Sequence, residues 1–216
     1  MDISLQNKLQ QALQEKKINQ VAFDEISKWM TDEEFAEFRD SLSEKIQSEN
    51  WDFLMDAFYR VLIFGTGGIR GVMDIGTNRM NNYMIRWASQ AYAQYILKHK
   101  STLASKGIAI AYDSRHNSET FMKETARVLA ANGIPVHIYD YYKATPQLSF
   151  TVRHLGCAGG IVLTASHNPP QFNGYKVYDE NGVQVLPDVG VEIEEEFKNI
   201  STINKMDFGE AVDKGL

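Results

Sequence analysis

The sequence predicts an α/β fold: a three-layer α/β/α domain with a mixed, mainly parallel sheet, preceded by an N-terminal helical extension. Two observations predict this class. Short apolar runs typical of buried strands alternate with amphipathic helical patterns from residue 81 to residue 163, as in βαβ units. Residues 1–60 instead have a charged, helical pattern. We therefore expect an extension over residues 1–60, the α/β/α domain over residues 61–200, and a tail over residues 201–216.

The N-terminal extension contains a pattern that marks a helix start. Thr31 to Glu34 match a capping box, in which a threonine hydroxyl and a glutamate side chain bind the first free amides of a helix. We expect the following helix to direct Phe35 and Phe38 toward a core. The charged residues of this segment are typical of a solvated helix face, and a binding tract is the alternative.

The elements of the α/β domain follow in order. A helix over residues 81–99 is predicted by one apolar stripe, formed by Met84, Trp87, Ala88, Ala91, Tyr92, Tyr95 and Ile96. Next we expect a buried strand over 107–113, a helix capped by Ser118 and ending near Asn132, a strand over 134–140, a helix over 147–154 and a strand over 160–163. Right-handed crossovers should join these units.

A hairpin pattern follows the last of these strands. The segments 175–178 and 182–185 flank the turn 179–182, which favours antiparallel pairing at the edge of the sheet. The glycine-rich segment from Gly65 to Gly71 is predicted to be a flexible loop. The sheet should therefore be mixed.

Composition and charge exclude several function classes. The 216 residues are 44% hydrophobic, enough for a good core, and carry a net charge of -6. No cluster of Lys and Arg suits nucleic acid or an anionic membrane, and no apolar run is long enough to span a bilayer. The single Cys157 cannot form an intrachain disulfide, and the first residues lack a signal-peptide pattern, so we expect a cytoplasmic protein. The sequon at Asn199 is then a chance match.

Ser166 is the strongest candidate for chemistry. It follows the apolar strand 160–163 directly, and Pro169, Pro170 and the turn at Asn173 stiffen the chain beyond it. A hydroxyl in that place can act as a covalent carrier, and an ordinary turn is the alternative. A serine hydrolase is disfavoured, because the surroundings lack the GxSxG elbow.

Several charged residues are candidates around this serine. The glycine spacing from Gly65 to Gly71 fails as a dinucleotide fingerprint and as a Walker loop, which leaves Arg70 as a phosphate ligand or a structural ion pair. His167 could orient a phosphate or move a proton, and Lys176 could stabilise charge or transfer a proton. Asp113 and Arg115 end a strand, where a loop-shaping ion pair is slightly favoured over a catalytic role. The histidines at 99, 116, 137 and 154 are best read as structural.

Three motifs carry a family resemblance. Residues 164–176 contain Thr-Ala-Ser-His-Asn-Pro and then Asn-Gly-Tyr-Lys, residues 64–71 are Phe-Gly-Thr-Gly-Gly-Ile-Arg-Gly, and residues 111–115 are Ala-Tyr-Asp-Ser-Arg. In this order they resemble the α-D-phosphohexomutases, the family of phosphoglucomutase and phosphomannomutase. The N-terminal helical extension and the sequences of the motifs look most like the branch with phosphoglucomutase-2-type enzymes and phosphopentomutases.

The resemblance implies a site and a reaction. Ser166 would be the phosphoserine, His167 part of its loop, Lys176 a group near the phosphoryl, and Arg70 a phosphate contact. The implied reaction interconverts sugar 1-phosphate and sugar 6-phosphate of glucose or mannose, or pentose 1- and 5-phosphate, through a sugar 1,6-bisphosphate. The implied cofactor is Mg²⁺, which Ser166 would bind through its phosphate.

The sequence also departs from the family. The resemblance implies four domains, and this sequence lacks the Asp-x-Asp-x-Asp-Arg metal loop, the Gly-Glu-Glu sugar loop and a terminal phosphate loop. We therefore expect domain I alone, a tail over 201–216 that leads to a second domain of the same polypeptide, remaining metal ligands in that domain, and no activity of this fragment by itself. A phosphate-binding or interaction module that is no longer catalytic is the alternative.

Overall fold

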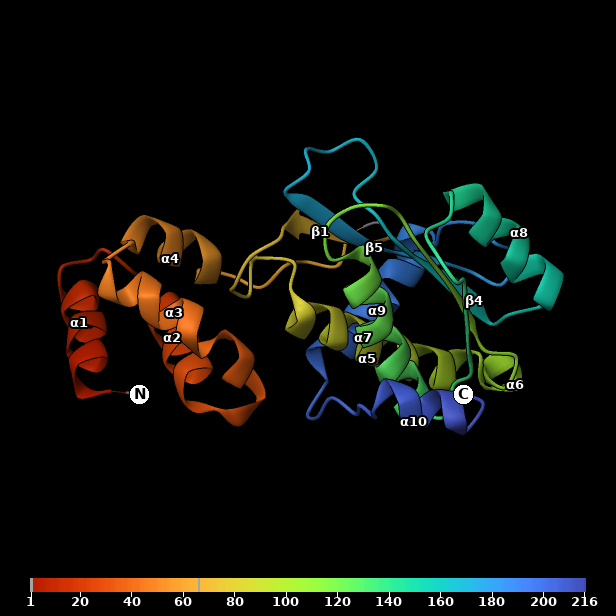
Figure 1. Cartoon of the computed structure of the whole chain (residues 1–216), viewed down its shortest axis with the longest axis horizontal. Helices are drawn as coiled ribbons and strands as arrows, with labels where there is room; N and C mark the ends of the chain where they lie inside the picture. The colour runs from red at the N-terminus through yellow and green to blue at the C-terminus, as the bar shows by residue number, and fades with distance from the viewer. Residues whose placement is uncertain (1, 66) are drawn as a thin grey trace. The chain divides into compact units, whose positions relative to one another are not determined.

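The computed structural model describes residues 2–65 and 67–216, which form two compact units (Figure 1). One unit comprises the chain up to Leu62 together with residues 71–81. The other comprises residues 63–70 and 82–216. Thr66, which belongs to the glycine-rich motif, lies outside the described residues.

The first unit is helical, as the sequence predicts. Its elements are α1 (Ile3–Gln14), α2 (Gln20–Thr31), the 3-10 helix η1 (Glu33–Phe38), α3 (Arg39–Gln47) and α4 (Trp51–Phe58). Trp29 lies at the centre of its core, where its ring stacks on Phe35 at 4.7 Å and meets the edge of Phe58 at 5.2 Å. Phe35 and Phe38 are both buried, so their predicted direction is confirmed.

The predicted capping box at Thr31 is wrong. Thr31 is the last residue of α2, and its hydroxyl donates to the carbonyl oxygen of Ser27 one turn back. Asp32 precedes η1 with extended backbone and no side-chain cap. The hydroxyl of a threonine can bind a carbonyl of the helix that it ends or cap the helix that follows. The local sequence spacing is the same in both cases, so it cannot distinguish them.

The second unit is built on a five-stranded mixed sheet with the order β1-β5-β4-β2-β3. The strands are β1 (Gly68–Val72), β2 (Ile108–Tyr112), β3 (Val136–Ile138), β4 (Gly159–Leu163) and β5 (Phe172–Tyr178). β2 pairs in parallel with both β3 and β4, whereas β4 and β5 are antiparallel. The α/β fold predicted from the sequence is confirmed.

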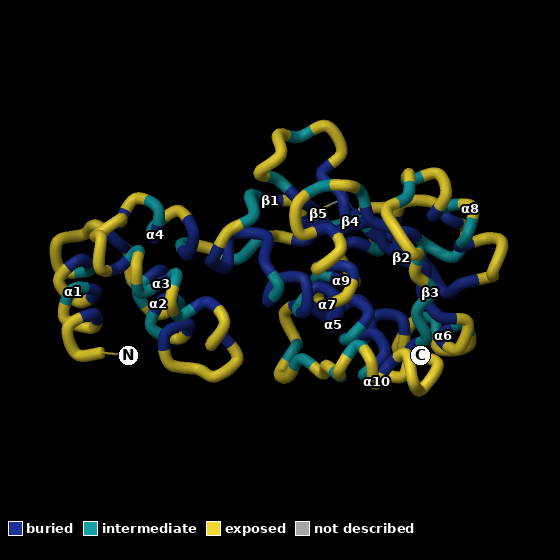
Figure 2. The backbone as a smooth tube through the Cα atoms, viewed as in Figure 1, coloured by how far each residue is buried: buried dark blue, intermediate teal, exposed yellow. Residues whose placement is uncertain are grey.

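Helices cover both faces of this sheet and complete three layers (Figures 1 and 2). One face packs on α7 (Ser118–Ala131) and is contacted by Tyr92 of α5 (Asn82–His99), and α9 (Pro187–Lys198) packs on α5. The other face packs on α8 (Thr145–Leu155). The short helices α6 (Ser101–Ala104) and α10 (Phe208–Asp213) lie against α5 and α7 respectively.

Two glycines at the start of β4 explain how helices approach both faces of the sheet so closely. Successive side chains of a strand point to opposite faces, and β4 begins with two glycines. A Cβ at Gly159 would lie 2.1 Å from the Tyr92 hydroxyl of α5, and one at Gly160 would lie 2.7 Å from Val152 of α8. The glycines therefore let a helix contact the sheet on each side, just before the strand reaches the Ser166 loop.

One prediction about the edge of the sheet is wrong, and another holds only in part. Residues 68–72 are not a loop but the edge strand β1, so β5 is an interior strand. The second arm of the predicted hairpin does pair antiparallel, but only through an isolated bridge between Tyr178 and Gln184 and not as a strand. β1 could not be predicted from its own residues, because its pairing depends on a distant strand and its glycines have low strand propensity.

Within residues 2–65 and 67–216, none of the helices is both long and apolar enough to cross a membrane.

Candidate functional site

Ser166 lies at the carboxyl end of β4 with an exposed side chain. Thr164 and Ala165 are buried, and the chain emerges at Ser166 with a φ of 58°, a left-handed conformation that non-glycine residues seldom adopt. The Ser166 amide donates to the Thr164 hydroxyl at 2.9 Å, and that hydroxyl donates to Asp113 at 2.6 Å. The backbone of Ser166 is thus held while its hydroxyl stays accessible.

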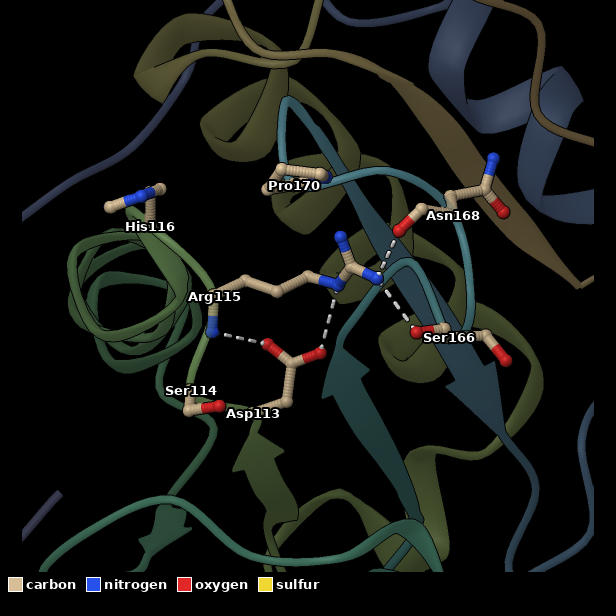
Figure 3. A pocket seen from close by; sticks show the side chains of 7 residues that line it. All are labelled: Asp113, Ser114, Arg115, His116, Ser166, Asn168 and Pro170. Atoms are coloured by element: carbon tan, nitrogen blue, oxygen red, sulfur yellow. Dashed lines mark hydrogen bonds and ion pairs between the residues drawn. The ribbon is translucent and has the colours of Figure 1, made fainter.

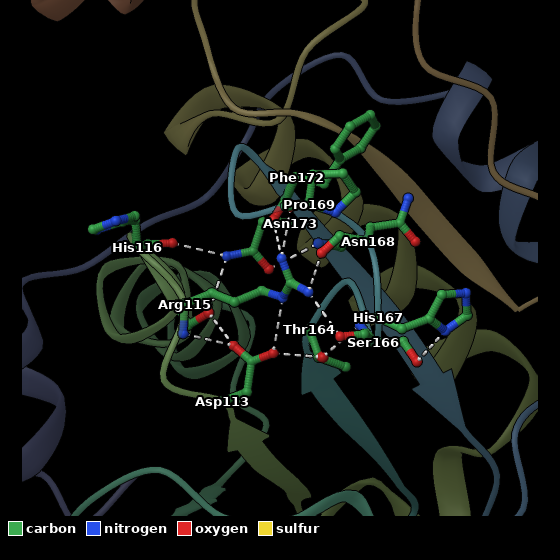
Figure 4. A network of polar contacts seen from close by, with 12 residues as sticks. Asp113, Arg115, His116, Thr164, Ser166, His167, Asn168, Pro169, Phe172 and Asn173 are labelled. Atoms are coloured by element: carbon green, nitrogen blue, oxygen red, sulfur yellow. Dashed lines mark hydrogen bonds and ion pairs between the residues drawn. The ribbon is translucent and has the colours of Figure 1, made fainter.

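Arg115 lies under the loop that follows Ser166 (Figure 4). Its guanidinium donates to the carbonyl oxygens of Ser166 at 2.7 Å, Asn168 at 2.6 Å, Pro169 at 2.9 Å and Phe172 at 3.1 Å. Its Nε lies 3.3 Å from the Asp113 carboxylate. The ion pair at the end of β2 that the sequence favours is therefore present, and it continues into the Ser166 loop.

A hollow of about 400 Å³ opens beside this loop (Figure 3). The residues that line it come from the loops after β2 and β4, and are Asp113, Ser114, Arg115, His116, Ser166, Asn168 and Pro170. In a doubly wound sheet, ligands bind at such carboxyl ends of strands. The hollow is a candidate binding site with Ser166 on its wall.

His167 is next to Ser166 and exposed. Its Nδ1 lies 3.3 Å from the Ser166 hydroxyl oxygen, so the two side chains form a long hydrogen bond whose direction depends on the histidine tautomer. The structure thus brings His167 and the Ser166 hydroxyl together.

Arg70 and Lys176 line a second hollow, of about 190 Å³, with the glycine-rich segment and Gln184. Arg70 also reaches the Ser166 loop, because its Nη1 donates to the Asn168 side chain at 3.0 Å. Burial lowers the pKa of Lys176, the neighbouring Arg70 lowers it further, and Asp113 opposes the shift. Two cations thus share this hollow, and convergence of Lys176 on the Ser166 hydroxyl stays a prediction.

Some supporting residues were misread or missed from the sequence. Ser118 does not cap α7, since Asn117 occupies that position with a φ of 62°. The Ser118 hydroxyl instead donates to Asp113 at 2.8 Å, and the buried Asn173 amide donates to the Ser118 oxygen and to the His116 carbonyl. Asp113 and Ser118 are only five residues apart, whereas Asn173 reaches Ser118 and His116 across 55 and 57 positions of sequence, which no local pattern shows.

The described residues offer no group of three or more His, Cys, Asp or Glu side chains arranged to hold a metal ion. The predicted Mg²⁺ contact through a phosphorylated Ser166 therefore stays a prediction.

Comparisons with known proteins agree with the motifs. The profile of the family described as phosphoglucomutase/phosphomannomutase, alpha/beta/alpha domain I, matches residues 61–204. A phosphoglucomutase of Staphylococcus saprophyticus is 45% identical over 161 residues, which are 73% of this chain and 29% of that protein. A human phosphopentomutase is 36% identical over 168 residues, 75% of this chain and 28% of that protein.

A solved structure shows the same fold. It is a protein of Thermus thermophilus, provisionally assigned as a phosphomannomutase, with a TM-score of 0.60 and 30% identity over 68% of this chain and 32% of that one. The fold, the three motifs and these relatives define a phosphohexomutase-type domain. The chain belongs to the phosphoglucomutase/phosphomannomutase family and contains its α/β/α domain I. It spans less than a third of the length of the curated relatives described above.

Proposed function

We propose that this chain is the part of a phosphohexomutase that carries the phosphoryl group, and that Ser166 is the carrier. The observation that carries the proposal is the accessible Ser166 hydroxyl at the end of β4, on the wall of a hollow within the stretch that matches the family. The relatives include a phosphoglucomutase and a phosphopentomutase. The proposed substrates are therefore 1- and 6-phosphates of a hexose, or 1- and 5-phosphates of a pentose, in the branch of phosphoglucomutase-2-type enzymes and phosphopentomutases.

The proposed reaction has two transfers. In the first, a sugar hydroxyl oxygen forms a bond to the phosphorus of phosphoserine, the bond from phosphorus to the Ser166 oxygen breaks, and the hydroxyl proton passes to a base. The sugar bisphosphate then reorients. In the second transfer its other phosphoryl group moves back to the Ser166 oxygen, and the released sugar oxygen takes up a proton.

The charged residues of the chain have distinct proposed roles. Arg70 and Lys176 would offset the negative charge of the phosphates, since both line the second hollow and Arg70 contacts the Ser166 loop. The depressed pKa of Lys176 also suits proton transfer. His167 would orient the Ser166 hydroxyl or its phosphate, because its Nδ1 is within 3.3 Å of that oxygen.

Mg²⁺ is the proposed cofactor, and it would neutralise oxygens of the transferred phosphoryl group. Phosphate oxygens on Ser166 suit such a hard cation, whereas the described residues supply no carboxylate cluster for it. The remaining ligands would come from further domains of the same polypeptide. We therefore propose that the 216-residue chain by itself does not convert glucose 1-phosphate into glucose 6-phosphate, even with Mg²⁺ and glucose 1,6-bisphosphate.

Phosphopeptide mass spectrometry tests the carrier. After incubation of the longer polypeptide with glucose 1,6-bisphosphate, the phosphate should be found on Ser166, and Ser166→Ala should lose mutase activity. The stability loss should be below about 1 kcal/mol, because among residues 2–65 and 67–216 the exposed hydroxyl has only the long hydrogen bond to His167.

Ser114→Ala is the matched control, since Ser114 is exposed and lines the same hollow. Phosphate on another residue, with Ser166→Ala still active, would refute the proposal. A full-length wild-type protein that binds sugar phosphates but is never phosphorylated would favour the non-catalytic module.

A further inference from the structure

The Ser166 loop cannot satisfy its own backbone carbonyls. Residues 166–171 form no strand or helix before β5 begins at Phe172, and Pro169 and Pro170 have no amide hydrogen to donate. Two hydrogen bonds close within the loop, from the Asn168 amide to the Ala165 carbonyl and from the Phe172 amide to the Pro169 carbonyl. The remaining carbonyls have no donor within the loop, so only solvent or a donor from elsewhere in the fold can satisfy them.

Arg115 supplies these donors from a distant part of the chain. An arginine has five N–H groups in a rigid plane. In Arg115, four of them point at the carbonyls of Ser166, Asn168, Pro169 and Phe172, and the fifth faces Asp113. The side chain is only 14% exposed. Its hydrogen-bonding capacity is therefore used by the loop, which leaves it no free donor for a substrate phosphate.

The contacts bracket the backbone of Ser166 on both sides. Its carbonyl oxygen accepts from Arg115, and its amide donates to Thr164, whose hydroxyl donates to Asp113. Asp113 also faces Arg115, so both supports share one carboxylate (Figure 4). A left-handed serine persists only where its surroundings fix it, and here the supports act on the two peptide groups that set its φ and ψ.

We infer that Arg115 is a positioning residue, which holds Ser166 in the conformation that exposes its hydroxyl, with Asp113 and Thr164 as the second support. This inference rests on the proposed role of Ser166 as phosphoryl carrier. Arg115 does not touch the transferred group. It acts through the backbone of the loop, whereas Arg70 and Lys176 are the cations available to phosphate.

Hydrogen exchange of the 216-residue chain tests the loop directly, without any catalysis. In Arg115→Ala, the amides of Ser166, Asn168 and Phe172 should exchange at least about tenfold faster, because their hydrogen bonds depend on the loop geometry. Added guanidinium ion, below the concentrations that unfold the protein, should restore part of the protection. The variant Arg115→Lys should show less protection of these amides than the wild type, since an ammonium group cannot donate to four carbonyls as the planar guanidinium does.

Arg153→Ala is the matched control. Arg153 also donates to a loop carbonyl, that of Asn181, but on α8 and away from the Ser166 loop. Unchanged exchange in Arg115→Ala, or equal loosening of the Ser166 loop in Arg153→Ala, would overturn the inference. Should Arg115→Ala fail to fold, Arg115→Lys carries the same test, because it keeps the charge and the aliphatic stem.

Kinetics of the longer polypeptide then link the loop to chemistry. Arg115→Ala should lower kcat by about 100-fold with little change in KM, as expected when a reacting group is misplaced by about 1 Å. A wild-type kcat in a variant with a loosened loop would overturn the positioning role. If instead the wild-type protein never carries phosphate on Ser166, the proposed function fails while the loosened loop of Arg115→Ala still stands.

Discussion

Gly68→Ala should be the most damaging single methyl addition in the sheet. Gly68 begins β1 with a φ of 146°, a conformation that L side chains rarely adopt. A Cβ there would lie 1.9 Å from the carbonyl oxygen of Tyr175 and 3.0 Å from the Cα of Lys176, both in β5. Because backbone cannot rotate away as a side chain can, β1 would have to move by about 1 Å.

The expected loss of stability follows from two costs. A non-glycine residue in such a backbone region costs about 1–3 kcal/mol, and forcing extra volume into a packed site costs about 1–3 kcal/mol more. The total is about 4 kcal/mol, which corresponds to a fall in Tm of about 8–16 °C for a chain of this size. Arg70 is carried by β1, so its hydrogen bond to Asn168 should also be lost.

Calorimetry measures the effect, with Gly133→Ala as the control. Gly133 has a φ of 75°, but a Cβ there meets nothing within 4 Å. Its replacement should cost only the backbone strain, about 1 kcal/mol or about 2–4 °C. Similar Tm values for the two variants would refute the conclusion that the contact between β1 and β5 requires a glycine.

Two further predictions concern ionisable groups. Arg70→Ala should raise the pKa of Lys176 toward the ordinary lysine value, because one repulsive charge is removed while the burial remains; an NMR titration of the lysine side chain would contradict this by showing no change. Glu124 is buried in α7, which raises its pKa, but hydrogen bonds from Arg86 and Arg127 outweigh burial and leave the pKa below 4.5. Its contribution to stability is therefore present above about pH 4.5 and lost as the pH falls through the lowered folded pKa. Urea unfolding should show a shallower loss of stability below pH 4.5 for Glu124→Gln than for the wild type, and equal slopes would contradict the assignment.

Local periodicity was sufficient for most elements of the second unit. The stripe that predicts α5 is buried as expected at Met84, Ala88 and Tyr92, while Trp87 is half-buried and stacks on Phe197 of α9. Apolar runs likewise predicted β2 and β4, because a strand covered on both faces needs no polar alternation. Such signals depend only on neighbours within a few residues.

The parts that sequence reasoning missed depend on distant partners. β1 is a strand because β5 lies beside it, and a glycine-rich segment has no local pattern that predicts this pairing. The Ser166 loop was predicted from its own residues, but the Arg115 contacts to its carbonyls span 51 to 57 positions of sequence. Two charged side chains at the end of a strand suggest an ion pair, so the pair of Arg115 with Asp113 could be predicted. Backbone carbonyls are the same in every residue, so the sequence could not show that Arg115 also binds carbonyls of the Ser166 loop.

Three cations, Arg115, Arg70 and Lys176, differ in how much of their hydrogen-bonding capacity the fold already uses. Arg115 has all five donors directed at protein acceptors. The Arg70 side chain has one such bond, to Asn168, and the Lys176 side chain has no hydrogen bond or ion pair within residues 2–65 and 67–216. Arg115 is therefore fixed by its protein contacts, and Arg70 and Lys176 are the cations that we propose for binding an anion.

This division also gives the direction of change on binding. Without an anion, burial and the charge of Arg70 disfavour the charged form of Lys176. A dianionic phosphate in the second hollow would favour that charged form, and the pKa of Lys176 should rise. Phosphate binding and protonation of Lys176 should therefore be coupled. An NMR titration of Lys176 with and without inorganic phosphate measures this coupling, and an unchanged pKa with phosphate bound would remove Lys176 from the proposed anion site.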